Sequence, residues 1–246
     1  MFAEDEAQLL VTTAATPAGL DAMIERRVAG EPLEHVLGWA EFCGLRVVVE
    51  PGLFVPRPRT EFLIQQAAAL ARQVEGTPVV LDMCCGTGAM AAALAAGLER
   101  AELHAADLDP AAVRCARRNL ADARVYEGDL YTPLPASLRG RVDILIASPP
   151  YVPSESVGLL PPEARLHEPL MALDGGGDGL DIVRRLIAGA PEWLAPGGHL
   201  LVETSERQAA DTVAAVARTG LTARAAGSDE LDATAVIGTL GKAPTP

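Results

Sequence analysis

From Val79 onward the sequence alternates short apolar runs with longer stretches that are rich in helix-forming residues. The expected strands are Val79–Leu81, Leu103–Ala106, Arg124–Tyr126, Ile144–Ala147, Leu200–Val202 and Ala233–Leu240. The expected helices are Gly88–Leu98, Pro110–Leu120, Leu180–Ala190 and Gln208–Arg218, and the sequence Pro196–Gly198 reads as a turn. Because parallel strands need crossover connections, this alternation predicts an α/β fold with a mostly parallel sheet and helices on both of its faces.

The region before Val79 has a different character and predicts a smaller N-terminal part. Residues 1–30 read as a short helical segment, in which Pro17 suits the first position of a helix. Residues 31–60 read as a β-hairpin linker, with a strand at Val47–Val49 and a strand or turn at Phe42–Leu45. The main domain is then expected over residues 61–246, beginning with a helix at Glu61.

Composition and charge narrow the class of protein. Hydrophobic residues make up 49% of the chain and the formal net charge is −13, which disfavours binding to nucleic-acid phosphates. The four cysteines, at positions 43, 84, 85 and 115, lack the spacing of metal ligands and predict reduced thiols in a cytoplasmic protein without a metal. No secretory signal or membrane-spanning run is predicted, so we expect no membrane association.

Three acidic or glycine-rich sites follow three successive expected strands. A turn with the sequence Asp82-Met83-Cys84-Cys85-Gly86-Thr87-Gly88 joins the first strand to a helix, where backbone N–H groups are free and glycines allow close approach of a ligand. Asp107 ends the second strand and suits the ribose hydroxyls of a nucleoside, while Asp129 after the third strand suits an adenine amino group. Together these sites predict adenosine binding.

S-adenosylmethionine (SAM) is the adenosine cofactor that this pattern favours. The turn has neither GxGxxG nor GxxxxGK[ST], so dinucleotides and triphosphates fit less well. Asp82 would favour the positive sulfonium of SAM. The candidate cofactor-binding residues are Asp82, Cys84, Cys85, Gly86, Thr87, Gly88, Asp107, Leu108, Asp129, Leu130 and Ser148.

The tetrapeptide Ser148-Pro149-Pro150-Tyr151 follows the expected strand at Ile144–Ala147. Two prolines fix the backbone and remove two N–H donors, so nearby carbonyl oxygens remain as acceptors beside an aromatic ring. Such a turn suits a planar –NH2 group, and ligands bind outside the carboxyl ends of strands in open α/β sheets. All four residues are therefore candidate catalytic residues.

Several motifs resemble those of the protein-(glutamine-N5) methyltransferases that modify the GGQ glutamine of peptide release factors. They are Gly30–Gly38, Phe54–Glu61, the glycine turn, Ala106-Asp107, Ser148–Tyr151, Glu168–Gly176, Pro196–Gly198 and Glu203, and they extend over most of the chain. The resemblance implies a Rossmann-like class I SAM-dependent methyltransferase fold with a seven-stranded sheet. It also implies a protein substrate such as a release factor, and a substrate-binding set of Phe54, Pro56, Arg57, Ser148, Pro149 and Tyr151.

This chain departs from the family pattern at three positions. Ser148 stands where the family has asparagine, Cys84 where it has glycine, and Arg59 where it usually has an acid. The family also has a longer helical domain before the motif that begins at Gly30, so we expect a shortened N-terminal extension here. In the family, the asparagine side-chain oxygen and the carbonyl of the first proline accept the two amide hydrogens. We expect the Pro149 carbonyl to keep its role here and Ser148 Oγ, on a shorter side chain, to accept the other hydrogen less efficiently.

Alternative readings stay open at this stage. The acceptor could be a small-molecule amine or amide, and less consistent readings are a DNA amino-methyltransferase or an inactive SAM-binding protein. Phe54 could form a wall of the acceptor site or pack in the core, and Glu203 could face the site or be a solvated strand end. The Pro/Gly-rich segment 152–179 is long for a simple connection and is a candidate lid.

Overall fold

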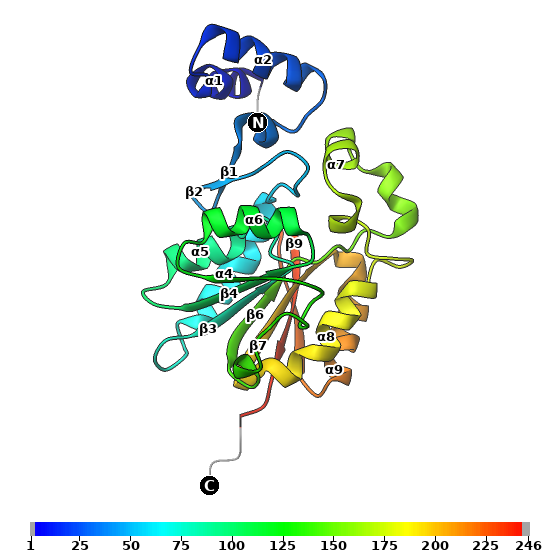
Figure 1. Cartoon of the computed structure of the whole chain (residues 1–246). Coiled ribbons are helices and arrows are strands. Elements are labelled where there is room, and N and C mark those ends of the chain that lie inside the picture. Colours follow the sequence, from blue (N-terminus) through cyan, green and yellow to red (C-terminus); the bar gives the residue numbers. More distant parts are fainter. Residues whose placement is uncertain (1–2, 243–246) are drawn as a thin grey trace.

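The computed structural model describes residues 3–242 and contains one large sheet with a small hairpin beside it (Figure 1). The strands of the large sheet lie in the order β5-β4-β3-β6-β7-β9-β8. Their bounds are β3 (Val79–Met83), β4 (Glu102–Asp107), β5 (Arg124–Glu127), β6 (Val142–Ala147), β7 (Leu194–Thr204), β8 (Thr222–Ser228) and β9 (Ala233–Thr239). The first five are parallel, whereas β9 is antiparallel to both β7 and β8. The predicted mostly parallel seven-stranded sheet is confirmed.

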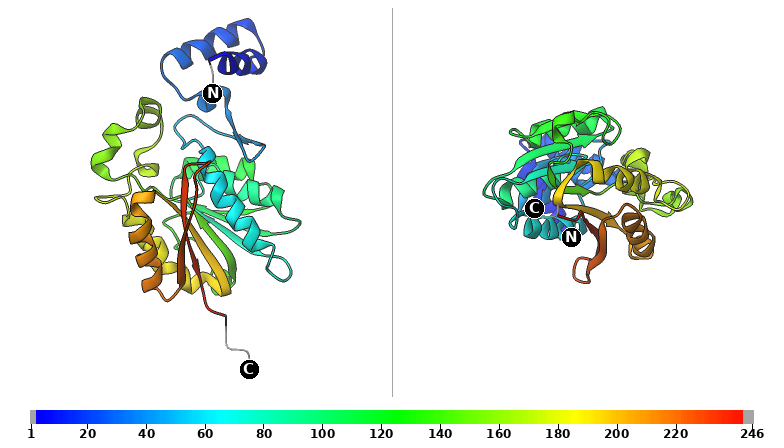
Figure 2. Two further views of the ribbon diagram at one scale, coloured as in Figure 1. Left: turned by 180° about the vertical axis from the view of Figure 1, so that it is seen from behind. Right: turned by 90° about the horizontal axis from the view of Figure 1, so that it is seen from below.

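Helices cover both faces of this sheet (Figure 2). On one face lie α4 (Glu61–Ala71), α5 (Ala89–Gly97) and α6 (Pro110–Asn119). On the other face lie α8 (Asp181–Trp193) and α9 (Ala209–Arg218). The alanines of α5 let it pack closely on β3 and β4, because small side chains shorten the distance between helix and sheet.

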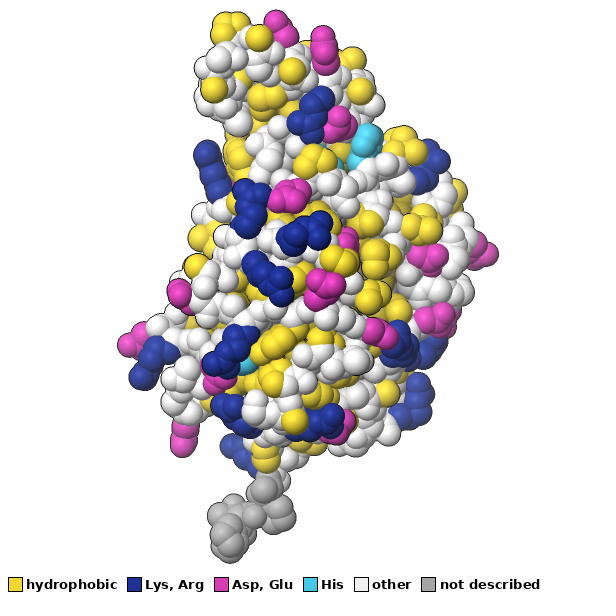
Figure 3. Space-filling view, in the orientation of Figure 1, with side chains coloured by type: hydrophobic (Ala, Val, Ile, Leu, Met, Phe, Trp, Pro, Cys, Tyr) yellow, Lys and Arg dark blue, Asp and Glu magenta, His cyan; other side chains and the backbone are white. Residues whose placement is uncertain are grey.

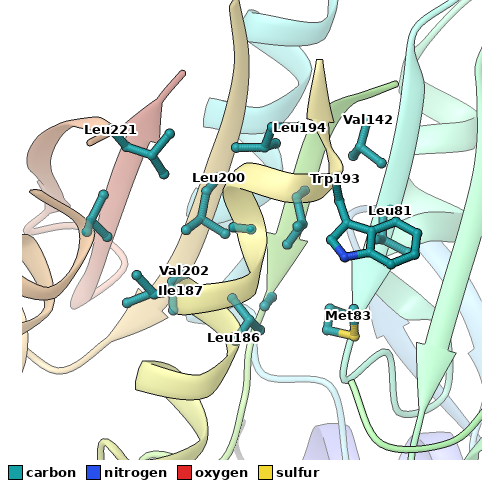
Figure 4. Packing of buried hydrophobic residues seen from close by; sticks show 14 of the residues in the cluster. Leu81, Met83, Val142, Leu186, Ile187, Trp193, Leu194, Leu200, Val202 and Leu221 are labelled. Carbon is teal, nitrogen blue, oxygen red and sulfur yellow. The ribbon is translucent and has the colours of Figure 1, made fainter. Parts of the chain in front are cut away.

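The larger part of the core lies between the sheet and α8. Figure 4 shows the Trp193 indole at the end of α8 over the strands, close to Leu81, with Leu186 and Ile187 continuing the apolar layer. Trp193 also stacks on Tyr131 with 5.7 Å between ring centroids. Removing such a buried aromatic side chain typically costs about 3–5 kcal/mol, so this packing fixes α8 against the sheet.

The N-terminal part lies beyond the carboxyl ends of the parallel strands (Figure 1). It consists of α1 (Ala3–Thr13), α2 (Pro17–Val28), α3 (Leu33–Leu37) and the hairpin of β1 (Trp39–Phe42) and β2 (Leu45–Val48). The segment 152–179 lies on the same side and forms α7 (Pro162–His167) with short 3₁₀ turns at Ser154–Leu159 and Leu170–Ala172. Arg27 connects the two parts through an ion pair with Glu163, at 2.7 Å.

The structure corrects several boundaries. β8 was not predicted, because its sequence of Ala, Gly, Thr, Arg and Ser lacks an apolar run and it forms an edge strand. Pro196–Gly198 lies within β7 rather than in a turn, although Gly197 has a φ of +85°. Helix α8 continues past Ala190 through Pro191, and α3 lies in the region predicted as a hairpin alone.

Charged side chains of one sign do not gather in one region of the face that Figure 3 draws. Figure 3 shows basic and acidic side chains intermixed on the face drawn there, instead of one region of positive charge. Over residues 3–242, no helix combines the length and apolar character needed to span a membrane. The same residues contain no group of three or more side chains placed to hold a metal ion.

Candidate active site

A cleft opens at the carboxyl ends of β3, β4, β5 and β6, and we call it the central cleft. Strand order reverses here, since β3 pairs with β4 on one side and with β6 on the other, and such switch points hold the ligands of open α/β sheets. The central cleft contains about 820 Å³ of empty space, counting the part open to solvent. Its lining includes Phe54, Cys84, Gly86, Asp107, Leu108, Asp129, Leu130, Ser148, Pro150, Met171 and Arg185.

Asp107 connects the glycine turn to the end of β4. Its Oδ2 accepts a hydrogen bond from the Gly86 N–H at 2.7 Å, and its Oδ1 accepts one from the Asp109 N–H at 2.9 Å. Burial raises the pKa of Asp107, while these two N–H groups act to lower it. A carboxylate has about four acceptor positions, so it can bind ribose hydroxyls while it holds the turn.

The turn itself has a strained, open backbone. Cys84, Gly86 and Gly88 have φ values of +58°, +53° and +78°. Gly86 has no atom within 4 Å of the place where a Cβ would stand, so its backbone faces open space in the cleft. Cys84 adopts a conformation that favours glycine, and burial raises the pKa of its thiol well above the usual range.

Asp129 lies at the far end of the cleft and is paired. Arg185 of α8 donates to Asp129 Oδ2 at 2.5 Å. Leu108 and Leu130 are apolar residues of the cleft lining that follow Asp107 and Asp129 in sequence. Leu130 has a φ of +47°. Two carboxylates at successive strand ends, with apolar side chains between them, fit the ribose and the base of an adenosine group.

Other predicted cofactor residues lie outside the lining of the central cleft. Asp82 is fully buried, and its Oδ2 accepts from the Ala91 N–H of α5 at 3.0 Å. Thr87 and Cys85 are also buried and border a smaller hollow behind the turn. Gly88 has a structural role, because a Cβ there would come within 2.8 Å of Leu120 Cδ1 and not of a ligand.

Ser148 and Pro149 stand between the central cleft and a second hollow. We call this the acceptor-side hollow, and Phe54, Arg59, Ser148, Pro149, Tyr151, Leu160, Glu163 and Leu173 are among the residues that line it. Ser148 lines both spaces. Within residues 3–242, no hydrogen bond is formed to Ser148 Oγ or to the Pro149 carbonyl, so both acceptors are open to a ligand.

Tyr151 is held in place by a buried carboxylate that the sequence left undecided. Glu203, which is 4% exposed, accepts from the Tyr151 hydroxyl at 3.0 Å and from Thr60 Oγ1 at 2.6 Å. Arg59 Nε adds a third bond to Glu203 at 3.3 Å. The Tyr151 carbonyl is fixed as well, because it accepts from Gln208 Nε2 at 2.9 Å. Glu203 is therefore a buried partner of the site residue Tyr151 and not a solvated strand end.

The segment after the hairpin forms the opposite wall. Phe54 lines both the central cleft and the acceptor-side hollow, and the Arg57 guanidinium carbon lies 4.7 Å from its ring centroid. Arg57 Nη2 lies 2.6 and 2.5 Å from the two oxygens of buried Glu168. Pro56 borders the smaller hollow behind the glycine turn. Arg57 is thus committed to a structural ion pair that anchors segment 152–179.

Sequence reasoning missed several lining residues. Arg185 comes from α8 and pairs with Asp129 across 56 residues of sequence, so no local pattern marks it. Pro169, Met171 and Ala172 reach the central cleft from segment 152–179; they lie in the motif Glu168–Gly176, but no role at the site was predicted for them. Leu53 also lines the cleft, and buried His35 contacts its carbonyl oxygen through Nε2 at 2.8 Å.

Comparison with known proteins identifies the family. Residues 46–165 match the family described as Methyltransferase small domain. A release factor glutamine methyltransferase of Geobacter sulfurreducens is 39% identical over 207 residues, which cover 82% of this chain and 71% of that protein. The chain belongs to the release factor glutamine methyltransferase family. Its fold is the class I fold of SAM-dependent methyltransferases, and its cofactor is SAM.

Two further similarities are informative about the breadth of this fold and family. The 4-amino-L-phenylalanine/4-methylamino-L-phenylalanine methyltransferase of Streptomyces pristinaespiralis is 39% identical over 205 residues, covering 80% of this chain and 69% of that protein. A methyltransferase from Pyrococcus furiosus is similar in structure, with a TM-score of 0.59 and 18% identity over 90% of this chain and 98% of that one. The last similarity concerns the fold alone.

Proposed function

We propose that this protein transfers the methyl group of SAM to the side-chain amide nitrogen (N5) of a glutamine in a protein such as a peptide release factor. The observation that supports this most directly is the position of Ser148 and Pro149. Ser148 lines both the central cleft and the acceptor-side hollow, Pro149 lines the hollow beside it, and the acceptor atoms of both are unpaired among residues 3–242. A group held there faces the cofactor on one side and the substrate on the other.

The proposed mechanism depends on orientation. An amide nitrogen is a weak nucleophile, because its lone pair is delocalised into the carbonyl group. Ser148 Oγ and the Pro149 carbonyl would accept the two –NH2 hydrogens and direct the nitrogen toward the central cleft, where bound SAM supplies an electrophilic methyl group on its sulfonium. Both acceptors would also stabilise the positive charge that develops on nitrogen, and such interactions contribute most in the transition state.

The surrounding residues complete this arrangement. Tyr151 would cover one face of the planar amide, with its ring fixed by the hydroxyl bond to Glu203. Phe54 would close the site from the other wall. The methylated amide nitrogen is acidic and loses its proton readily to water, so no general base is required among these side chains.

A small-molecule amine or amide is a second candidate acceptor. Ser148 is shorter than the asparagine of the family motif, so its oxygen reaches less far toward an amide. The relative from Streptomyces pristinaespiralis is named for an amino acid with an aromatic amine, at 39% identity. Both observations support an acceptor whose amine sits differently from that of a glutamine side chain.

The test is transfer of a tritiated methyl group from SAM to purified release factor, with a GGQ-to-GGA release factor as the negative control. We expect label in the GGQ protein only. Ser148→Asn should raise the rate by roughly tenfold if a glutamine amide is the natural acceptor, because a longer side chain restores a hydrogen bond worth about 1–3 kcal/mol. If neither version labels the GGQ protein, glutamine methylation is refuted. If 4-amino-L-phenylalanine is labelled in its place, the second candidate is supported.

A further inference from the structure

Arg59 lies at the border between the acceptor-side hollow and a neighbouring depression. It belongs to the 3₁₀ turn Pro58–Thr60, and its side chain is 45% exposed. The neighbouring depression, which we call the outer hollow, lies at the ends of β7, β8 and β9, and Arg59 and Tyr151 line both spaces. A ligand that extends from Ser148 past Tyr151 therefore comes to Arg59.

The guanidinium of Arg59 has donors beyond those that its protein partners use. Its Nε donates to Glu203 at 3.3 Å and the guanidinium also interacts with the Tyr151 hydroxyl, but no ion pair involves its terminal nitrogens among residues 3–242. The other arginines near this hollow are engaged differently. Arg57 Nη2 bonds to Glu168, and Arg27 bonds to Glu6, Glu163 and the Glu31 carbonyl. Arg57 and Arg59 both line the acceptor-side hollow. Arg57 is held by a short ion pair through a terminal nitrogen, whereas the ion pair of Arg59 is longer and uses Nε.

The charges around Arg59 restrict how an anion could approach. Glu203 is buried and already accepts bonds from Thr60 and Tyr151. The outer hollow carries the acidic side chains Glu206, Asp229 and Asp232, which would repel an anion from that side. In the acceptor-side hollow the acidic lining residue is Glu163, which is paired with Arg27. An anionic group therefore fits Arg59 only from the side of Ser148.

We propose that Arg59 binds a carboxylate of the methyl acceptor, at the end remote from the methylated nitrogen. The inference rests on the proposed N-methyl transfer, since Ser148 and Pro149 fix where the nitrogen lies. The two terminal nitrogens of a guanidinium can match the two oxygens of a carboxylate in a planar, bidentate geometry. The carboxylate can be the α-carboxylate of a free amino acid or an acidic side chain beside the target glutamine in a protein segment.

The experiment measures binding, so it does not depend on turnover. Ligand-observed NMR titrations would use enzyme loaded with S-adenosylhomocysteine and three pairs of compounds that differ only in one carboxylate. The pairs are 4-amino-L-phenylalanine and its carboxamide, L-glutamine and its carboxamide, and two capped pentapeptides, Gly-Gly-Gln-Gly-Glu and Gly-Gly-Gln-Gly-Gln. We expect the carboxylate member of at least one pair to bind roughly tenfold more tightly, as for other bidentate arginine contacts. The pair that shows the preference identifies the source of the carboxylate.

Three variants assign the preference to Arg59. Arg59→Gln should reduce it to twofold or less, and Arg59→Lys should retain part of it because lysine keeps the charge but not the fork. The matched control is Arg46→Gln, which removes an equal charge from the hairpin, where Arg46 stacks on Trp39. Circular dichroism would check that each variant is folded.

Two outcomes overturn the proposal. One is the absence of any carboxylate preference in the wild-type protein, which includes failure of all six compounds to bind. The other is a preference that survives in Arg59→Gln. Failure of release factor labelling alone refutes the glutamine assignment and leaves these binding results as a separate measurement, so the two failures can be told apart.

Discussion

At the scale of single residues, Asp82 lies in the glycine turn of the cofactor motif, but its contacts are with the protein core. The sequence places it in the glycine turn, where it was predicted to attract the sulfonium of SAM. The structure buries it completely, with Oδ1 as a buried side-chain atom lacking a partner among the described residues. Burial raises the pKa of Asp82 to about 8, opposed by the Ala91 N–H.

This shift predicts a pH dependence of stability. The unfolded Asp82 titrates near pH 4, so between about pH 4 and 8 the folded protein holds a proton that the unfolded chain releases. The contribution of Asp82 to the free energy of unfolding is therefore greatest below pH 4 and is lost as pH rises toward 8. We expect Asp82→Asn to show a smaller decline in unfolding free energy between pH 5 and 8, measured by urea denaturation. Parallel pH profiles for the two proteins would contradict this.

Asp107 lies at the end of β4 and lines the central cleft, as the sequence predicted for a residue that binds the ribose. We expect Asp107→Asn to weaken SAM binding by about 1–3 kcal/mol, because the amide replaces a charge-assisted acceptor of the ribose hydroxyls. Isothermal titration calorimetry would measure the affinity. Asp122→Asn removes an acid of the same type from an exposed position and serves as the control. Equal SAM affinity for a folded Asp107→Asn and the wild type would remove this assignment.

At the scale of elements, the ion pair between Arg57 and Glu168 fixes segment 152–179 against the wall that precedes α4. The Glu168 carboxylate is 1% exposed, whereas the Arg57 side chain is 28% exposed. Burial raises the pKa of Glu168 in spite of Arg57. The pair therefore stabilises the segment mainly because either partner alone would be costly to bury.

Removing one partner should be worse than removing both. We expect Arg57→Met to destabilise the fold by about 3 kcal/mol, since it leaves Glu168 with only a 3.4 Å bond from the Val55 N–H. The double variant Arg57→Met/Glu168→Leu should recover most of that loss. Urea denaturation of the four proteins in a double-mutant cycle would measure it. The loss in Arg57→Met should shrink at low pH as Glu168 gains a proton, and a pH-independent loss would argue against a buried charge as its cause.

Elements with a strong local pattern were predictable, and those that depend on distant partners were not. β3 and β6 are mostly apolar runs that are buried almost throughout, so the sequence marks them directly. β8 is stabilised by its pairing with β9 and lacks such a run. The role of Glu203 could not be settled from sequence, because its partner Thr60 is 143 residues away. The division into residues 1–30, 31–60 and 61–246 remains a prediction about independent units.

At the scale of the whole molecule, the central cleft is built by parts that are distant in sequence. The ends of β3, β4, β5 and β6 supply its floor, Phe54 one wall, and Pro169 and Met171 another. A bound cofactor would contact all of these parts at once. Ligands that bind only the folded state stabilise it in proportion to the logarithm of their concentration.

We therefore expect SAM to raise the melting temperature. At a SAM concentration of about 100 times Kd the stabilisation is about 2.7 kcal/mol, and for a chain of this size each kcal/mol corresponds to about 2–4 °C. The expected shift is thus about 5–10 °C, measured by differential scanning calorimetry. A loss of about 1–3 kcal/mol in SAM affinity should make Asp107→Asn lose roughly a third to nine-tenths of the shift at the same SAM concentration. Arg59→Gln should keep the full shift, because Arg59 lines the acceptor-side hollow and not the central cleft. A full shift in Asp107→Asn would mean that the ribose does not bind at Asp107. A lost shift in Arg59→Gln would mean that SAM binding in the central cleft depends on a residue of the acceptor-side hollow.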